Sequence, residues 1–175
     1  MSNSLLSRVP ESATMVLVRS PAMEGRTHAC SGLLSHAERV LLVGYAGANV
    51  EGLRDRLLEA DEELPPVREL DVGTEVEPGD LTGLGIAIAE SLDPGTSVCF
   101  DSLTAMLQYA DSERAFQFLH ALGERCATAE TTAHFHLDFE SADETTHAAL
   151  STLMDAIVDP TEGTVTVRPE LTEKD

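Results

Sequence analysis

Short apolar segments alternate with segments of helical periodicity along most of this 175-residue chain, and this alternation is the strongest limit on its fold. The apolar segments, which are typical of buried strands, are 15–18, 39–45, 96–101 and 131–137. The second of them is continuously apolar, as strands covered on both faces of a parallel sheet are. The alternation predicts an α/β fold with a mostly parallel sheet and right-handed crossovers.

Further elements complete this prediction. Apolar spacing and capping residues predict helices over 27–37, 50–60, 80–92, 103–109, 111–127 and 145–158. Two more strands are expected, a short edge strand at 67–72 and a last strand at 164–168. We expect a lead-in over 1–12, a single domain over 13–168 and a flexible, acidic tail over 169–175.

The charge is strongly one-sided, with 31 acidic against 11 basic residues and a net charge of −20. Lys174 is the only lysine. This pattern resembles proteins of salt-accumulating halophilic archaea, whose surface carboxylates are screened in molar salt. The deficit of cations argues against binding of nucleic acids or anionic membranes through charge.

The three cysteines, Cys30, Cys99 and Cys126, are widely spaced and have apolar neighbours. Their odd number and the lack of a C-x-x-C pair indicate buried free thiols in a reducing compartment. No segment has the apolar length of a signal peptide or a membrane span. We therefore expect a soluble, cytoplasmic protein.

The strand at 15–18 leads into a loop that partly matches the phosphate-binding consensus G-x-x-x-x-G-K-[ST]. Gly25 and Thr27 match, whereas Ser20 and Arg26 replace the first glycine and the lysine, and Glu24 adds a negative charge. The candidate nucleotide-binding residues of this frame are Ser20, Pro21, Ala22, Met23, Glu24, Gly25, Arg26 and Thr27. Without further support, the loop could equally be an ordinary turn between a strand and a helix.

Asp101 ends the apolar segment 96–101, some seventy residues after that loop. An acid at this point of a phosphate-binding fold would hold Mg²⁺ together with the Thr27 hydroxyl. The alternative is a capping or turn residue, since aspartate is common at strand ends.

The phrases EPGDLTGLGIAIAESL, SVCFDSLTAMLQY, HFHLD and ALSTLMDAIVD, together with this loop, resemble RecA-like P-loop ATPases of the KaiC type. The likeness is in particular to short, degenerate KaiC-like proteins of halophilic archaea, and it extends over most of residues 13–168. It implies a three-layer α/β sandwich with the strand order fifth, first, fourth, third, second. It also implies phosphates at residues 20–27, Mg²⁺ between Thr27 and Asp101, and a catalytic base after the second strand.

The sequence has Ala46 and Gly47 where the resemblance places that base, and neither can accept a proton. With Ser20 and Arg26, three departures coincide, so we expect no significant hydrolysis, no catalytic residue and no resident cofactor. The expected function is a non-catalytic regulatory or protein-interaction module, with protein partners or self-association through RecA-like faces. The alternatives are a switch that binds ATP or GTP with Mg²⁺ weakly, and a slow ATPase completed by a partner subunit.

His134 and His136 alternate on a predicted strand and therefore share one face. With His147 or Asp138 they could form a metal site, because histidine is a common ligand of transition metals. The alternative is a pair of half-buried residues hydrogen-bonded to the acidic loops. His28, in the first turn of the predicted helix after the loop, could contact an anion or be exposed.

Other polar features have simpler interpretations. Ser102 and Thr104 lack the G-x-S-x-G elbow of a serine hydrolase. The acidic loops at 73–80 and 138–144 fit either an interface or halophilic surface. Four further acids, which read as solvated surface charge, are Asp111, Glu113, Asp143 and Glu144.

Overall fold

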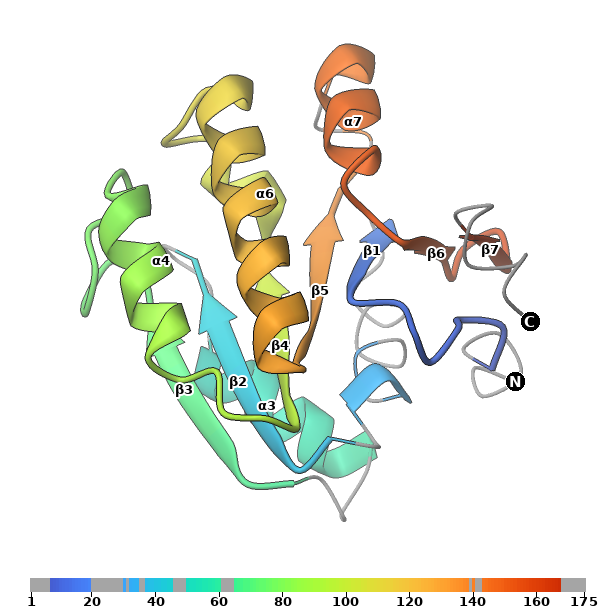
Figure 1. The fold of residues 1–175 in the computed structure, drawn as a ribbon, viewed down its shortest axis with the longest axis horizontal. Coiled ribbons are helices and arrows are strands. Elements are labelled where there is room, and N and C mark those ends of the chain that lie inside the picture. Colours follow the sequence, from blue (N-terminus) through green and yellow to red (C-terminus); the bar gives the residue numbers. More distant parts are fainter. Residues whose placement is uncertain are drawn as a thin grey trace.

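The computed structural model describes residues 7–19, 30, 32–34, 37–45, 50–60, 65–138, 140 and 143–167. Among them, seven strands form one sheet in the order β3-β2-β4-β5-β1-β6-β7 (Figure 1). The strands are β1 (Met15–Arg19), β2 (Arg39–Gly44), β3 (Val67–Asp71), β4 (Thr96–Asp101), β5 (Thr132–Leu137), β6 (Ala156–Asp159) and β7 (Thr164–Val167). Every neighbouring pair is parallel except β6 and β7. The α/β fold with a mostly parallel sheet is therefore as predicted.

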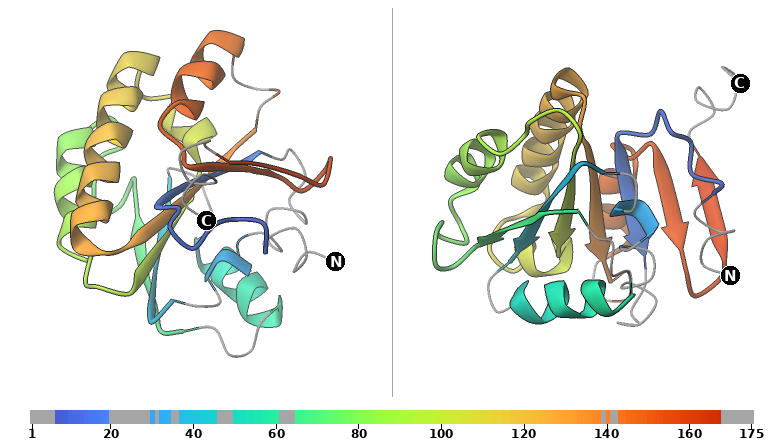
Figure 2. Two further views of the ribbon diagram at one scale, coloured as in Figure 1. Left: turned by 45° about the vertical axis from the view of Figure 1, so that its right-hand side comes forward. Right: turned by 90° about the horizontal axis from the view of Figure 1, so that it is seen from below.

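Helices lie on both sides of this sheet. They are α3 (Val50–Ala60), α4 (Leu81–Ala89), α5 (Leu103–Met106), α6 (Ser112–Ala129) and α7 (Glu144–Ser151). Figure 2 shows α3 on one side of the sheet and α4 and α6 on the other. Residues 30 and 32–34 are also helical. Among the described residues, no helix is both long enough and apolar enough to cross a membrane.

Successive residues of the central strands point to opposite faces, and each face has its own apolar core. Leu41 and Val43 of β2 belong to the larger core, which contains residues of α4 and α6. Val40 and Leu42 belong to the smaller core, which contains residues of α3, Cys30 and Cys99. This two-sided burial explains why β2 is continuously apolar.

Polar side chains cap the helices at their first turns. Asp80, Ser102, Asp111 and Asp143 each accept a hydrogen bond from the backbone N–H three residues later. The predicted cap at Asp80 is confirmed. Asp111 and Asp143 are exposed, as expected, but they also satisfy N–H groups that a helix leaves without partners. The hydrogen bonds from Thr146 lower the pKa of Asp143.

The helix predicted over 145–158 is wrong in its second half. Helix α7 ends at Ser151, and residues 156–159 form β6 beside β1. The Asp155 carboxylate accepts the backbone N–H groups of Thr14 and Met15, at 2.8 and 3.0 Å. The Asp155 N–H donates to the Met15 carbonyl at 2.8 Å. Pairing with the edge of β1 therefore overrides the helical spacing of the apolar residues.

The expected strand order is also wrong, because β6 pairs with the edge of β1. The four strands β2, β4, β5 and β1 lie in the expected sequence, but β6 takes the place beside β1 that was assigned to the last strand. The last strand is β7, which pairs antiparallel with β6 through a tight turn. Gly163 adopts φ +70° in that turn, a conformation that favours glycine. The edge strand predicted at 67–72 is confirmed as β3.

Candidate functional site

The carboxyl ends of the parallel strands form the edge at which ligands of such sheets bind. Strand β1 ends at Arg19, and helical structure is described again at residue 30. The candidate phosphate-binding residues 20–27 lie between these points and outside the described residues, as do His28, Ala46 and Gly47.

Asp101 is the described member of the predicted nucleotide site. It is the last residue of β4, and its side chain is buried. Strand β5 separates β4 from β1 in the sheet, and β1 leads directly into residues 20–27. Asp101 therefore lies at the carboxyl ends of the strands, which is the edge of the sheet where the nucleotide and Mg²⁺ are expected.

The end of β2 lies directly beside Asp101. The backbone N–H of Tyr45 donates to the Asp101 carbonyl at 2.8 Å. The Tyr45 ring is fully buried, with centroids 5.9 Å from Phe100 and from Tyr109, and its hydroxyl donates to the Pro78 carbonyl. Burial raises the pKa of Tyr45 to about 12. Tyr45 is thus a neutral part of the core and offers no base to this edge.

Acidic residues lie at the ends of four strands at this edge. Asp71, Asp101 and Asp159 are the last residues of β3, β4 and β6, and Asp138 directly follows β5. Three of these carboxylates accept hydrogen bonds from groups two or three residues further along the chain, and so stabilise the turns that leave the sheet. Carboxylates at this edge would also repel the phosphates of a nucleotide unless a cation neutralises them.

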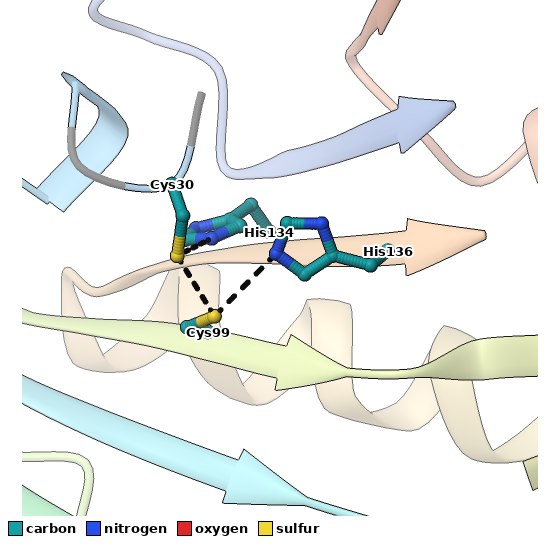
Figure 3. Close-up of side chains that lie close together, drawn as sticks. All are labelled: Cys30, Cys99, His134 and His136. Atoms are coloured by element: carbon teal, nitrogen blue, oxygen red, sulfur yellow. Dashed lines mark hydrogen bonds between the residues drawn. The ribbon is translucent and has the colours of Figure 1, made fainter. Parts of the chain in front are cut away.

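A second group of chemically reactive side chains gathers on the face of the sheet that is covered by α3. It contains Cys30, Cys99, His134 and His136, all of which are buried (Figure 3). Nε2 of His134 lies 3.0 Å from Sγ of Cys30, and Nε2 of His136 lies 3.6 Å from Sγ of Cys99. The two sulfurs are 3.0 Å apart. We call this group the Cys–His cluster.

The cluster differs from both interpretations of the two histidines. They are fully buried rather than half-buried, and thiol groups contact them. Asp138 and His147 do not belong to the cluster. Asp138 stabilises a turn, and the pKa of His147 is lowered by burial and then by the positive charge of Arg19.

The cysteines were predicted as buried free thiols, and this is confirmed for all three. What the sequence did not indicate is that Cys30 and Cys99 face the two histidines. Strand alternation correctly placed His134 and His136 on one face, but the neighbours of that face depend on how the strands pair. The hydroxyl-bearing residues near Asp101 have structural roles, since Ser102 caps α5 and the Thr104 hydroxyl accepts the Asp138 N–H.

Comparison with solved structures finds the same fold in two archaeal proteins. The chain superposes on the flagellar accessory protein FlaH of Methanocaldococcus jannaschii with a TM-score of 0.60 and 12% sequence identity, over 89% of this chain and 76% of that one. A protein of Pyrococcus horikoshii OT3, project PH0250, gives a TM-score of 0.62 and 9% identity, over 97% and 94% of the two chains. At these identities, the likeness concerns the fold alone.

Residues 13–160 match the model of a family of unknown function, DUF7504. Since the match covers most of the chain, the protein belongs to this family. No curated protein sequence matches it significantly.

Proposed function

We propose that this protein is a non-catalytic RecA-like domain that acts as a regulatory or protein-interaction module in the cytoplasm of a halophilic archaeon. The observation that carries the proposal is the position of the β2 end. The Tyr45 N–H is bonded to the Asp101 carbonyl, so the described end of this part of the chain, Tyr45, lies beside the candidate magnesium ligand, and two residues follow it in the sequence. Those residues are Ala46 and Gly47, which can neither accept a proton nor orient a water molecule.

The replaced residues of the loop support the same conclusion. Arg26 stands where a phosphate-binding lysine is required, and its planar guanidinium does not reproduce the compact ammonium group. Ser20 and Glu24 add a side chain and a negative charge to the expected anion site. The acids at the strand ends add further negative charge.

The test is ATP turnover by the full chain with Mg²⁺ in molar KCl, with Asp101→Ala as the matched variant. We expect no turnover above about 10⁻⁴ s⁻¹, which is near the intrinsic rate of a slow GTPase, for either protein. Faster turnover that is lost in Asp101→Ala would overturn the proposal and favour the slow ATPase.

Buried Asp101 at the end of β4 favours one alternative, a switch that binds nucleotide without turnover. Titration calorimetry with ATP and Mg²⁺ separates the two functions. Binding tighter than about 100 µM, or about −5.5 kcal/mol, that is abolished in a Thr27→Ala, Asp101→Ala double variant would establish the switch. Absence of binding heat at millimolar nucleotide, from folded protein, would support the non-catalytic module.

An interaction role is supported by α4. Its sequence from Leu81 to Ala89 contains no charged residue, although the whole chain has a net charge of −20. Ile86 is 53% exposed on this helix. An exposed, uncharged helix surface on so acidic a protein is a candidate contact for a second copy or another protein.

Sedimentation velocity in molar KCl tests self-association. Ile86→Glu should shift an oligomer toward the monomer, whereas Leu58→Glu, an exposed position on α3 at the opposite side of the sheet, should not. A wild-type chain that is monomeric at the highest concentrations would exclude self-association through α4.

A further inference from the structure

The Cys–His cluster is separate from the candidate nucleotide site and has the composition of a metal centre. Cys30, Cys99, His134 and His136 are each at most 2% exposed. Each offers one ligand atom, and these four atoms all lie within 4.8 Å of one another. Two thiols and two imidazoles are the ligand set of many structural zinc sites.

The sheet register creates most of this arrangement. Cys99 of β4 and His134 of β5 are paired residues of adjacent parallel strands, so their side chains stand next to each other on the same face. His136 lies two residues further along β5 and therefore points to the same face. Cys30 approaches from the helical segment that covers this face, where it packs in one apolar cluster with Leu34 and Leu57.

The distances are of the size that tetrahedral coordination requires, with both contacts of Cys30 shorter than in a zinc-bound site. Zn–S bonds of about 2.3 Å and Zn–N bonds of about 2.0–2.1 Å place neighbouring ligand atoms about 3.3–3.8 Å apart. The measured separations are 3.0 Å between the two sulfurs, 3.0 Å from Cys30 to His134 and 3.6 Å from Cys99 to His136. The imidazole planes are nearly perpendicular, at 86°, which allows both rings to approach one shared point from different sides (Figure 3).

Charge balance also fits a divalent ion. Two thiolates neutralise Zn²⁺, and two neutral imidazoles complete the shell without adding charge. A neutral centre avoids the large cost of burying a net charge in an apolar core. Metal binding displaces protons from the cysteines.

We propose that Cys30, Cys99, His134 and His136 bind one Zn²⁺ ion in a closed, tetrahedral, structural site. Four protein ligands leave no open position for a substrate or a reactive water, so the ion stabilises the fold and does not catalyse. Its effect is to tie residue 30, three positions after Thr27 in the chain, to strands β4 and β5. The proposal does not depend on the function proposed above, because none of its ligands belongs to the nucleotide site.

The first experiment measures metal content in the full chain, purified in molar KCl without chelators from cells supplied with zinc. We expect one zinc per chain in the wild type. Cys126→Ser is the matched control, because Cys126 is also a buried free cysteine but lies in the other core. Cys126→Ser should keep the zinc, whereas Cys99→Ser and His134→Gln should lose it.

A second measurement does not depend on variants that fold poorly. Co²⁺ replacing Zn²⁺ in the wild type should give the ligand-field bands of tetrahedral cobalt and thiolate-to-cobalt charge-transfer bands. X-ray absorption of the zinc protein should show two sulfur and two nitrogen ligands. A metal bound only by oxygen would be an adventitious ion on the acidic surface and would overturn the proposal.

Two further results would also overturn it. One is a wild-type chain that stays metal-free after refolding with zinc while all three thiols remain titratable. The other is a disulfide between Cys30 and Cys99 in protein purified under reducing conditions, seen as loss of two titratable thiols after the chain is denatured with a chelator that removes zinc. The first result would make the cluster a packed group of core side chains, and the second would make it a crosslink.

Discussion

Replacing Glu130 by glycine should stabilise the protein, because this residue holds an unfavourable backbone conformation. Glu130 ends helix α6 with φ 58° and ψ 45°, in the left-handed region. Its N–H donates to the carbonyls of Cys126 and Ala127, so the conformation closes the last turn of the helix. The side chain is exposed, and its removal leaves no cavity.

The magnitude follows from two opposing backbone effects. The left-handed conformation costs a residue with a Cβ about 1–2 kcal/mol, and glycine does not incur this cost. Glycine instead loses about 0.5–1 kcal/mol through the greater freedom of its unfolded chain. The net gain in unfolding free energy is about 0.5–1 kcal/mol, and at this chain length 1 kcal/mol raises the Tm by about 2–4 °C.

A charge effect has to be separated from this backbone effect. A carboxylate at the C-terminal end of a helix is unfavourable by about 0.3–1 kcal/mol at low ionic strength and by less in salt. Glu130→Ala removes the same charge but keeps the Cβ. Urea unfolding followed by circular dichroism in molar KCl should therefore rank Glu130→Gly above Glu130→Ala. An alanine variant as stable as the glycine variant would refute the reasoning.

Four other predictions concern stability. Burial raises the pKa of Tyr45 to about 12 in the folded state, so the contribution of Tyr45 to the unfolding free energy should be constant below pH about 10 and fall, by at most about 2.7 kcal/mol, as pH rises from about 10 to about 12. The Tyr45→Phe variant should lack that part of the decline when urea midpoints are measured against pH. Asp80→Ala removes the cap that accepts the Gly83 N–H at 2.9 Å and should cost about 1 kcal/mol, whereas Asp80→Asn should cost less; equal losses would contradict the capping role. Phe100→Ala should cost about 3–5 kcal/mol in the same assay, because this ring is fully buried among other aromatic rings, and a loss no larger than that of the partly buried Phe116→Ala would contradict it. Raising KCl from millimolar to molar should increase the Tm because it screens repulsion within a chain of net charge −20, and a Tm independent of salt would exclude the halophilic interpretation.

The sequence determined most of the local structure. Helix α3 lies at the predicted residues 50–60, and strand β4 lies at the predicted 96–101. These elements are predictable from their apolar residues. A strand that is buried on both faces must be continuously apolar, whereas a helix that is buried on one face has apolar residues at helical spacing. The alternation of these patterns was sufficient for the fold class.

Residues 150–158 show the limit of such patterns. Their apolar spacing fits a helix, but β1 had an unpaired edge, and Asp155 binds its backbone there. The free energy of that pairing depends on a strand about 140 residues earlier, which no local pattern describes. The insertion of β6 then changed the strand order.

The candidate nucleotide site and the Cys–His cluster differ in how far local sequence patterns predict them. Asp101 could be predicted because the motif places an acid at one strand end, and the structure confirms that it ends β4. The histidines could be placed on one face because a strand alternates. Their meeting with Cys30 and Cys99 was decided only by the tertiary structure, because residues 30, 99, 134 and 136 come together through the register of β4 and β5 and the packing of a covering helical segment.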